Sequence, residues 1–313
     1  MKRFILQVIC LLVLVFPTSG LAGTYHAPEG CSNQAPRLAV MSALVSELEE
    51  LVERAEIHNS CVINGRTFYI GKLSGNKVVL FVSGMSMVNA AMMIQTALDH
   101  FNVTGIVFSG IAGGVNPGLN IGDVTVPARW AQYQENLFAR ETPKGWDVGW
   151  HTDVFGNFGM MFPQYVSITR KGETPDAEKN KFWFEVDPEM LRVAARVGNQ
   201  VELNTCTPEG MCLDHEPIVV VGGNGVSGQT FVDNAEYRDW VWGNFEADAL
   251  DMESAAVAHV AYVNQVPFIA FRSLSDLAGG GAGENQIFTF LQLAAENSSR
   301  VVVAFLKEWS EEH

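Results

Sequence analysis

The chain has 313 residues, of which 48% are hydrophobic and 18% are charged, as is typical of a globular protein rather than a disordered one. Its formal net charge of −15 argues against nucleic acid or an anionic membrane as the main partner, because both require a basic surface. A small anionic ligand in a local pocket is still compatible with this charge.

The first 22 residues have the pattern of a secretory signal peptide. Lys2 and Arg3 precede an apolar run at 4–16, and Gly20-Leu21-Ala22 forms a small-x-small cleavage site. The run is too short to span a bilayer. We therefore predict a signal peptide at 1–22 and a secreted or periplasmic mature chain at 23–313 with no membrane attachment. The alternative is an uncleaved N-terminal anchor.

Hydrophobic periodicity predicts strands that alternate with helices along the rest of the chain. In chain order we expect a buried strand at 37–43, an acidic helix at 46–55, a strand at 77–82, a helix at 88–98, a strand at 105–108, short β segments at 124–126 and 218–221, a strand at 267–271, and a final helix at 284–309 that a break could interrupt. This alternation indicates an α/β fold around a central, two-sided sheet.

One stretch does not show this alternation of strands and helices. Residues 128–205 are rich in Trp, Phe, Gly and Pro and contain few periodic runs, so we interpret them as an insertion. The chain has no internal repeat, low-complexity tract or linker, and a single domain is expected.

The mature chain would keep four cysteines, and their number permits two disulfides in an exported protein. Sequence proximity favours Cys206–Cys212, which leaves Cys31–Cys61 by elimination. Their spacing matches no zinc motif, so we expect no metal.

Glycine-rich turns and acidic residues follow several of the expected strands. The turns lie at 83–84, 109–114 and 222–228, and none is a complete P-loop or dinucleotide fingerprint, so no cofactor is expected. Glu47 lies beyond the first strand, Asp251 and Glu253 open an Ala-rich helix, and Asp276 follows the last strand. Ligands of open α/β sheets bind at the carboxyl ends of strands, where such carboxylates can act as acid and base. Helix capping is the alternative explanation for Asp251 and Asp276.

These residues stand in blocks that resemble the nucleoside phosphorylase superfamily. The blocks are Asp251-Met252-Glu253-Ser254-Ala255-Ala256, Arg272-Ser273-Leu274-Ser275-Asp276, Ser42-Ala43-Leu44-Val45-Ser46-Glu47, Ser83-Gly84-Met85, Gly110-Ile111-Ala112-Gly113-Gly114 and Val226-Ser227-Gly228-Gln229-Thr230-Phe231. Within the superfamily, the chain is most similar to 5′-methylthioadenosine/S-adenosylhomocysteine nucleosidases and to the plant bark and vegetative storage proteins. The resemblance implies a single-domain, three-layer α/β/α fold with a mixed, twisted sheet.

The resemblance also implies the substrate, a purine nucleoside, and a role for each matching residue. Asp276 would protonate purine N7, and Ser275 would orient the Asp276 carboxyl. Glu253 would bind the ribose hydroxyls. Glu47 and Arg272 would hold and activate the attacking water. The expected substrate-binding residues are Met252 under the sugar, Phe231 stacked on the base, the backbone at Val232, and Ser83 and Gly113. Without the resemblance, core packing is the simpler interpretation of Met252 and Phe231. The resemblance also implies that the chain forms a homodimer or a homotrimer.

Hydrolysis is favoured over phosphorolysis. The resemblance implies that a phosphorylase would place Arg and Ser or Thr around phosphate, whereas this chain has Glu47 in the first loop and Phe108 and Ile111 near the central glycines. A carboxylate repels phosphate and suits water as a general base. Ile111 also departs from the nucleosidases, which usually carry a small polar residue there. The alternatives are a phosphate-dependent phosphorylase and a non-catalytic nucleoside-binding or storage protein.

Overall fold

The computed structural model describes residues 31, 33–281 and 283–313, so the expected signal peptide at 1–22 lies outside the described residues. The helices are α1 Val45–Glu53, α2 Met87–His100, α3 Pro188–Gly198, α4 Ala235–Phe245, α5 Ser254–Asn264 and α6 Ile287–Glu312, with a short 3-10 helix at Pro175–Ala177. The main strands are β1 Asn33–Ser42, β2 Glu56–Ile63, β3 Arg66–Leu73, β4 Asn76–Val82, β5 Phe101–Gly114, β6 Val124–Val126, β7 Arg129–Ala131, β14 Trp183–Glu185, β15 Val219–Val221, β16 Asn224–Ser227, β17 Ala247–Asp251 and β18 Phe268–Asp276.

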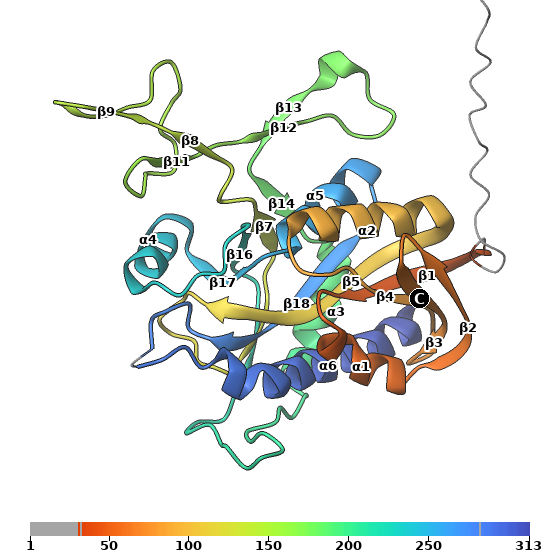
Figure 1. The fold of residues 1–313 in the computed structure, drawn as a ribbon. Helices are drawn as coiled ribbons and strands as arrows, with labels where there is room; N and C mark the ends of the chain where they lie inside the picture. The colour runs from red at the N-terminus through yellow and green to blue at the C-terminus, as the bar shows by residue number, and fades with distance from the viewer. Residues whose placement is uncertain (1–30, 32, 282) are drawn as a thin grey trace, which may run out of the picture.

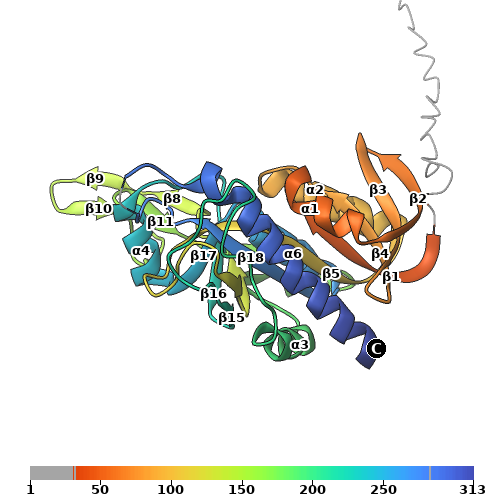
Figure 2. The ribbon, with the colours of Figure 1, turned by 90° about the horizontal axis from the view of Figure 1, so that it is seen from below.

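The fold is a three-layer α/β/α arrangement around one mixed sheet, as expected (Figure 1). Strands β1, β4, β5 and β18 run parallel to one another, while β17 runs antiparallel to β5. Helices α2 and α5 pack together on one face (Figure 1), and α6, with α1 and α3 against it, covers the other (Figure 2). The parallel strands are buried on both faces, which explains their continuous apolar sequences.

The expected elements of the core are present, and several others are not visible in the sequence pattern. The final helix is unbroken, and β18 continues to Asp276 rather than ending near residue 271. The glycine-rich segment at 109–114 is not a turn, because it continues β5, where β17 and β18 both pair with it. Most of the expected turn at 222–228 is likewise a strand, β16, which pairs with β7 and β17. Hairpin β2–β3 and helices α3 and α4 were not anticipated.

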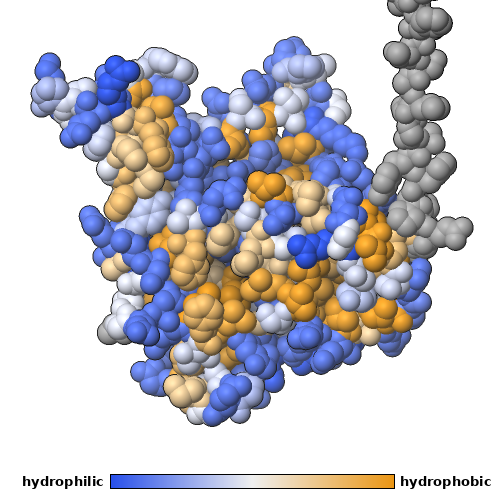
Figure 3. All heavy atoms as spheres, in the orientation of Figure 1, coloured by the Kyte–Doolittle hydropathy of each residue, from blue (hydrophilic) through white to orange (hydrophobic). Residues whose placement is uncertain are grey.

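The range 128–205 contributes to the body of the molecule at its two ends. Strands β7 and β14 pair at the edge of the central sheet, and α3 packs against α6. Between them, two projections leave the body: one built from β8 Asn136–Phe138, β9 Arg140–Thr142, β10 Gly145–Asp147 and β11 Met161–Pro163, and one built from β12 Val166–Ile168 and β13 Lys179–Lys181. A notch separates them in the space-filling view (Figure 3).

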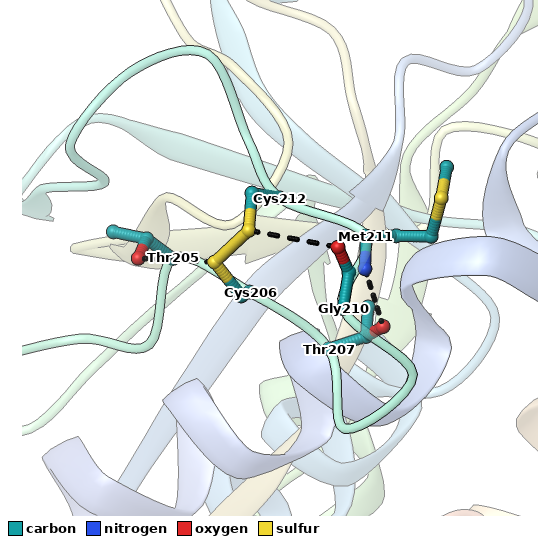
Figure 4. The surroundings of a disulfide bond; sticks show 6 residues. All are labelled: Thr205, Cys206, Thr207, Gly210, Met211 and Cys212. Atoms are coloured by element: carbon teal, nitrogen blue, oxygen red, sulfur yellow. Dashed lines mark hydrogen bonds between the residues drawn. A yellow bond between two sulfur atoms is a disulfide. The ribbon is translucent and has the colours of Figure 1, made fainter.

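The structure contains two disulfides, with the pairing that sequence proximity favoured. Cys31 is bonded to Cys61 on β2, and Cys206 is bonded to Cys212. The second bridge closes a small loop in which the Met211 N–H donates to Thr207 Oγ1 at 3.4 Å (Figure 4). No helix among the described residues is both long enough and apolar enough to cross a membrane.

Candidate active site

The glycine-rich end of β5 is the axis around which the expected site residues gather. In the strand register, Arg272 lies opposite Gly110 and Asp276 opposite Gly113, while Leu250, which precedes Asp251 on β17, also pairs with Gly113. Because β1, β4, β5 and β18 are parallel, their carboxyl ends meet at this edge of the sheet. The fold therefore brings together residues that are up to 229 positions apart in the chain, Glu47 and Asp276.

Glu47 is held at the start of α1 by three backbone N–H groups. Its Oε2 accepts hydrogen bonds from Ala43 (2.9 Å) and Leu44 (2.7 Å), and its Oε1 accepts one from Ile111 (3.0 Å). The carboxyl is buried, and this burial raises its pKa above the ordinary value, although Arg272 and the three hydrogen bonds oppose the shift. A raised pKa makes Glu47 a stronger base once it is ionised.

Arg272 lies on β18 and is 1% exposed. Its Nε donates to Asp251 at 2.6 Å, and its guanidinium lies 4.0 Å from the ring centroid of Phe108. Gly110 makes this placement possible, since a Cβ at that position would overlap Arg272 Nη1 and would lie 3.0 Å from Glu47 Oε1. Among the described residues, Nη2 of Arg272 has no hydrogen-bond partner. The site therefore contains a buried cation with one free donor group.

Glu253 lies immediately before α5 and is also buried. Its Oε1 accepts a 2.7 Å hydrogen bond from the N–H of Ser86, in the turn that follows β4. Burial, and then the neighbouring charge of Asp251, raise the pKa of Glu253 to about 8. The residue that precedes it, Met252, is partly buried.

Asp276 closes β18 and forms the other end of the site. Its Oδ2 accepts a hydrogen bond from Ser275 Oγ (3.0 Å), and its Oδ1 accepts one from the N–H of Ala278 (2.8 Å). Burial raises the pKa of Asp276, and this favours a carboxyl that carries a proton. Gly113 provides the room, because a Cβ there would stand 3.3 Å from Oδ1.

The remaining expected residues differ in how they are placed. Phe231 is 51% exposed, so core packing does not explain it, whereas the adjacent Val232 is buried. Ser83 is buried, and its hydroxyl donates to the Gly84 carbonyl at 2.9 Å, so it is already engaged with the backbone. In the described part of the chain, no group of three His, Cys, Asp or Glu residues could hold a metal ion.

Two contributors were missed by the sequence analysis, and a third, Asp251, was singled out there without its partner. Ser86 supplies only its backbone N–H, which no residue pattern reveals. Asn285 donates to Asp233 (3.1 Å) and Asp276 (3.4 Å) from the loop before α6, where the polar residue after several glycines was the available signal. Helix capping is the alternative explanation that the sequence offers for Asp251. Asp251 does accept a hydrogen bond from the Ser254 N–H at 3.1 Å, but it also pairs with Arg272.

The fold and the strand-end carboxylates define a nucleoside phosphorylase-like protein. A model of the phosphorylase superfamily matches residues 37–307, so the chain belongs to this superfamily.

Its relatives include nucleosidases and plant storage proteins. The chain is 29% identical over 266 residues to 5′-methylthioadenosine/S-adenosylhomocysteine nucleosidase of Staphylococcus epidermidis, covering 85% of this chain and 96% of that one. It is 28% identical over 243 residues to bark storage protein A of Populus deltoides, covering 73% and 74%.

Solved structures agree with this placement. The crystal structure of the Neisseria meningitidis 5′-methylthioadenosine/S-adenosylhomocysteine nucleosidase in complex with methylthio-immucillin-A aligns with a TM-score of 0.64 at 26% identity, covering 86% of this chain and 98% of that one. Futalosine hydrolase of Helicobacter pylori aligns with a TM-score of 0.65 at 22% identity, covering 87% and 97%, which supports the fold alone.

Proposed function

We propose that the protein is a purine-nucleoside N-ribosyl hydrolase that acts on methylthioadenosine, adenosine or a related nucleoside. The observation that supports this most is the gathering of three buried carboxyls, Glu47, Glu253 and Asp276, around the glycine-rich end of β5. Similar groups in different surroundings can take acid and base roles in one reaction. The similarity to nucleosidases supports the same reaction class.

In this proposal, the N-glycosidic bond breaks as the oxygen of water bonds to C1′ of the ribose. Asp276 gives its proton to N7 of the leaving purine, and Glu47 takes a proton from the water, with Arg272 beside it. Glu253 accepts hydrogen bonds from the ribose hydroxyls. We assign substrate contacts to Met252, Phe231 and Val232, and to Ser275, Gly113 and Ser83 around them.

Hydrolysis, rather than phosphorolysis, is supported by the residues that surround Arg272. Glu47 places a carboxylate beside Gly110, where an incoming phosphate would meet a like charge. Phe108 presents a ring to the guanidinium instead of a second cation. Both features suit an uncharged nucleophile.

The assay that tests this proposal measures release of free base from adenosine, inosine and methylthioadenosine, with and without phosphate. Phosphate-independent release of base and free ribose supports hydrolysis. Turnover that requires phosphate and yields ribose 1-phosphate would establish the phosphorylase. Calorimetric binding without turnover would establish a storage or nucleoside-binding protein, an alternative that the similarity to bark storage protein A favours.

We also propose export of the protein, because two disulfides accompany a signal-like sequence at 1–22. N-terminal sequencing of protein recovered from the culture medium or periplasm should begin at Gly23, and an intact Met1 on cell-associated protein would contradict export.

A homodimer or homotrimer is proposed from the α2–α5 face. Val88 and Met92 of α2 are 67% and 47% exposed, and a groove of about 350 Å³ beside them is lined by residues among which Asp, Glu, Lys and Arg are absent. Because the chain is strongly acidic, two copies should repel each other least where they meet through a face without charged side chains. Light scattering after size exclusion should show an oligomer that Met92→Glu converts to monomer, and a monomeric native protein would contradict it.

A further inference from the structure

Asp251 is a buried carboxylate whose two oxygens are both fully engaged. Oδ1 accepts hydrogen bonds from Ser227 Oγ and from the N–H groups of Glu253 (3.2 Å) and Ser254 (3.1 Å). Oδ2 accepts them from Ser254 Oγ (2.5 Å) and Arg272 Nε (2.6 Å). The donors come from β16, β18 and the beginning of α5, while Asp251 itself ends β17 and is 5% exposed. One side chain thus joins three strands and a helix at the edge of the candidate site.

The bond to Asp251 determines how the guanidinium of Arg272 is turned. With Nε held by Asp251 and the ring of Phe108 4.0 Å away, the plane of the guanidinium has little freedom. Its Nη1 lies close to Gly110, as Glu47 Oε1 does, and its Nη2 has no partner among the described residues. A buried donor group left without a partner is costly unless a ligand or water satisfies it.

We propose that Asp251 is a positioning residue, which orients Arg272 toward the ligand and fixes the turn that carries Glu253 without touching the nucleoside itself. This inference rests on the proposed hydrolase function. It goes beyond helix capping, because a cap would need the bond to Ser254 but not the one to Arg272. The two oxygens of a single carboxylate perform both tasks.

The charge of Asp251 has a second, measurable effect. Glu253 faces Asp251 from β17, Arg272 from β18 and Glu47 from α1; burial first, and then Asp251, raise its pKa to about 8, while Arg272 lowers it. Replacing Asp251 with Asn keeps the shape and removes the charge. The pKa of Glu253 should then fall, and the limb of the pH profile that reports it should move to lower pH.

The experiment compares Asp251→Asn with the native protein in kcat, KM and the pH dependence of kcat/KM, using whichever of adenosine and methylthioadenosine is the better substrate. We expect kcat to fall about 100-fold, as when a reacting group is displaced by about 1 Å, and the limb to shift to lower pH. Unchanged kcat and an unchanged profile would overturn the proposal. If the native protein releases no base, the proposed function fails first, and this role fails with it.

Asp248→Asn is the matched control, because Asp248 lies on the same strand, is 6% exposed and is bonded to Asn116 Nδ2 at 2.8 Å. It should lower stability and leave the pH limb in place, and an equal shift in this variant would overturn the proposal.

If Asp251→Asn does not fold, Ser227→Ala removes one donor to Asp251 and keeps the charge. It should lower kcat with little change in KM, and a native kcat would count against the proposal.

Discussion

The backbone N–H of Ser86 donates a 2.7 Å hydrogen bond to Oε1 of Glu253, although the two residues are 167 positions apart in the chain. Ser86 has φ 86° and ψ 153°, a conformation that is essentially restricted to glycine, and it directly precedes α2. The turn after β4 therefore holds an unfavourable backbone conformation while its N–H meets the carboxylate.

Ser86→Gly should stabilise the protein by about 1–3 kcal/mol, because glycine adopts this conformation without the strain that serine bears. Activity should be retained, since the bond to Glu253 uses only the backbone. Urea denaturation and the base-release assay measure the two effects. A loss of stability on substitution would show that the Ser86 side chain contributes more than its conformation costs.

The stability of the protein should fall as pH rises from about 5 to 8. The pKa of Glu253 is about 8 in the folded state and about 4.5 when exposed, so the folded state binds the extra proton between these values, and that stabilising contribution is lost as pH rises through 8. Thermal melting of Glu253→Gln should show a smaller fall over this range. The variant should keep part of the decrease in stability with pH, because burial also raises the pKa values of Glu47 and Asp276. Glu49→Gln, at an exposed position of α1, should behave as the native protein does; identical slopes in all three would refute the assignment.

Asp276→Asn should reduce base release by about 10²–10⁴-fold, the range for loss of a general acid. Nucleoside binding measured by calorimetry should change little, since Asn can still accept the hydrogen bond from Ala278. Asp239→Asn, at an exposed position of α4, is the control and should retain full activity. Turnover of Asp276→Asn within a few-fold of native would exclude Asp276 as the acid.

Gly110→Ala should displace Arg272, because the added Cβ would overlap its Nη1. We expect a loss of about 1–3 kcal/mol in the free energy of unfolding, as for other overpacked sites, together with lower kcat. Gly243→Ala is a matched control in α4, where a Cβ would meet nothing within 4 Å. That variant should gain up to about 1 kcal/mol from helix propensity. Equal stability of the two variants would contradict the crowding at Gly110.

The two disulfides should differ in their effect on stability. Cys31–Cys61 spans 30 residues and Cys206–Cys212 spans 6. The entropy that each bridge removes from the unfolded chain should therefore stabilise the folded state by about 3–4 kcal/mol for the first bridge and by about 2–3 kcal/mol for the second. Urea denaturation of the two double variants, Cys31→Ser with Cys61→Ser and Cys206→Ser with Cys212→Ser, measures both losses in the free energy of unfolding. A larger loss on removal of Cys206–Cys212 would contradict this order.

Much of the core was predictable because its strands and helices carry strong periodic signals. The buried run that ends β1 and the spacing of α2 appear in the sequence as they do in the structure. The strand at 109–114 could not be predicted, since its glycines suggest a turn locally. It is a strand because it pairs with β17 and β18. Hairpin β2–β3 was missed because β2 is mostly exposed and lacks an apolar run.

Residue types and their spacing are enough to establish the alternation of strands and helices, the acidic balance, and the presence of Glu47, Glu253 and Asp276 in family-like blocks. Which groups meet became visible in the folded chain alone: the Ser86 N–H contacts Glu253, Arg272 contacts Asp251, and Asn285 contacts Asp276. The reason is that the register of parallel strands, and burial beside neighbouring charges, arise when distant segments pack. Those two factors place the carboxyls and raise their pKa values.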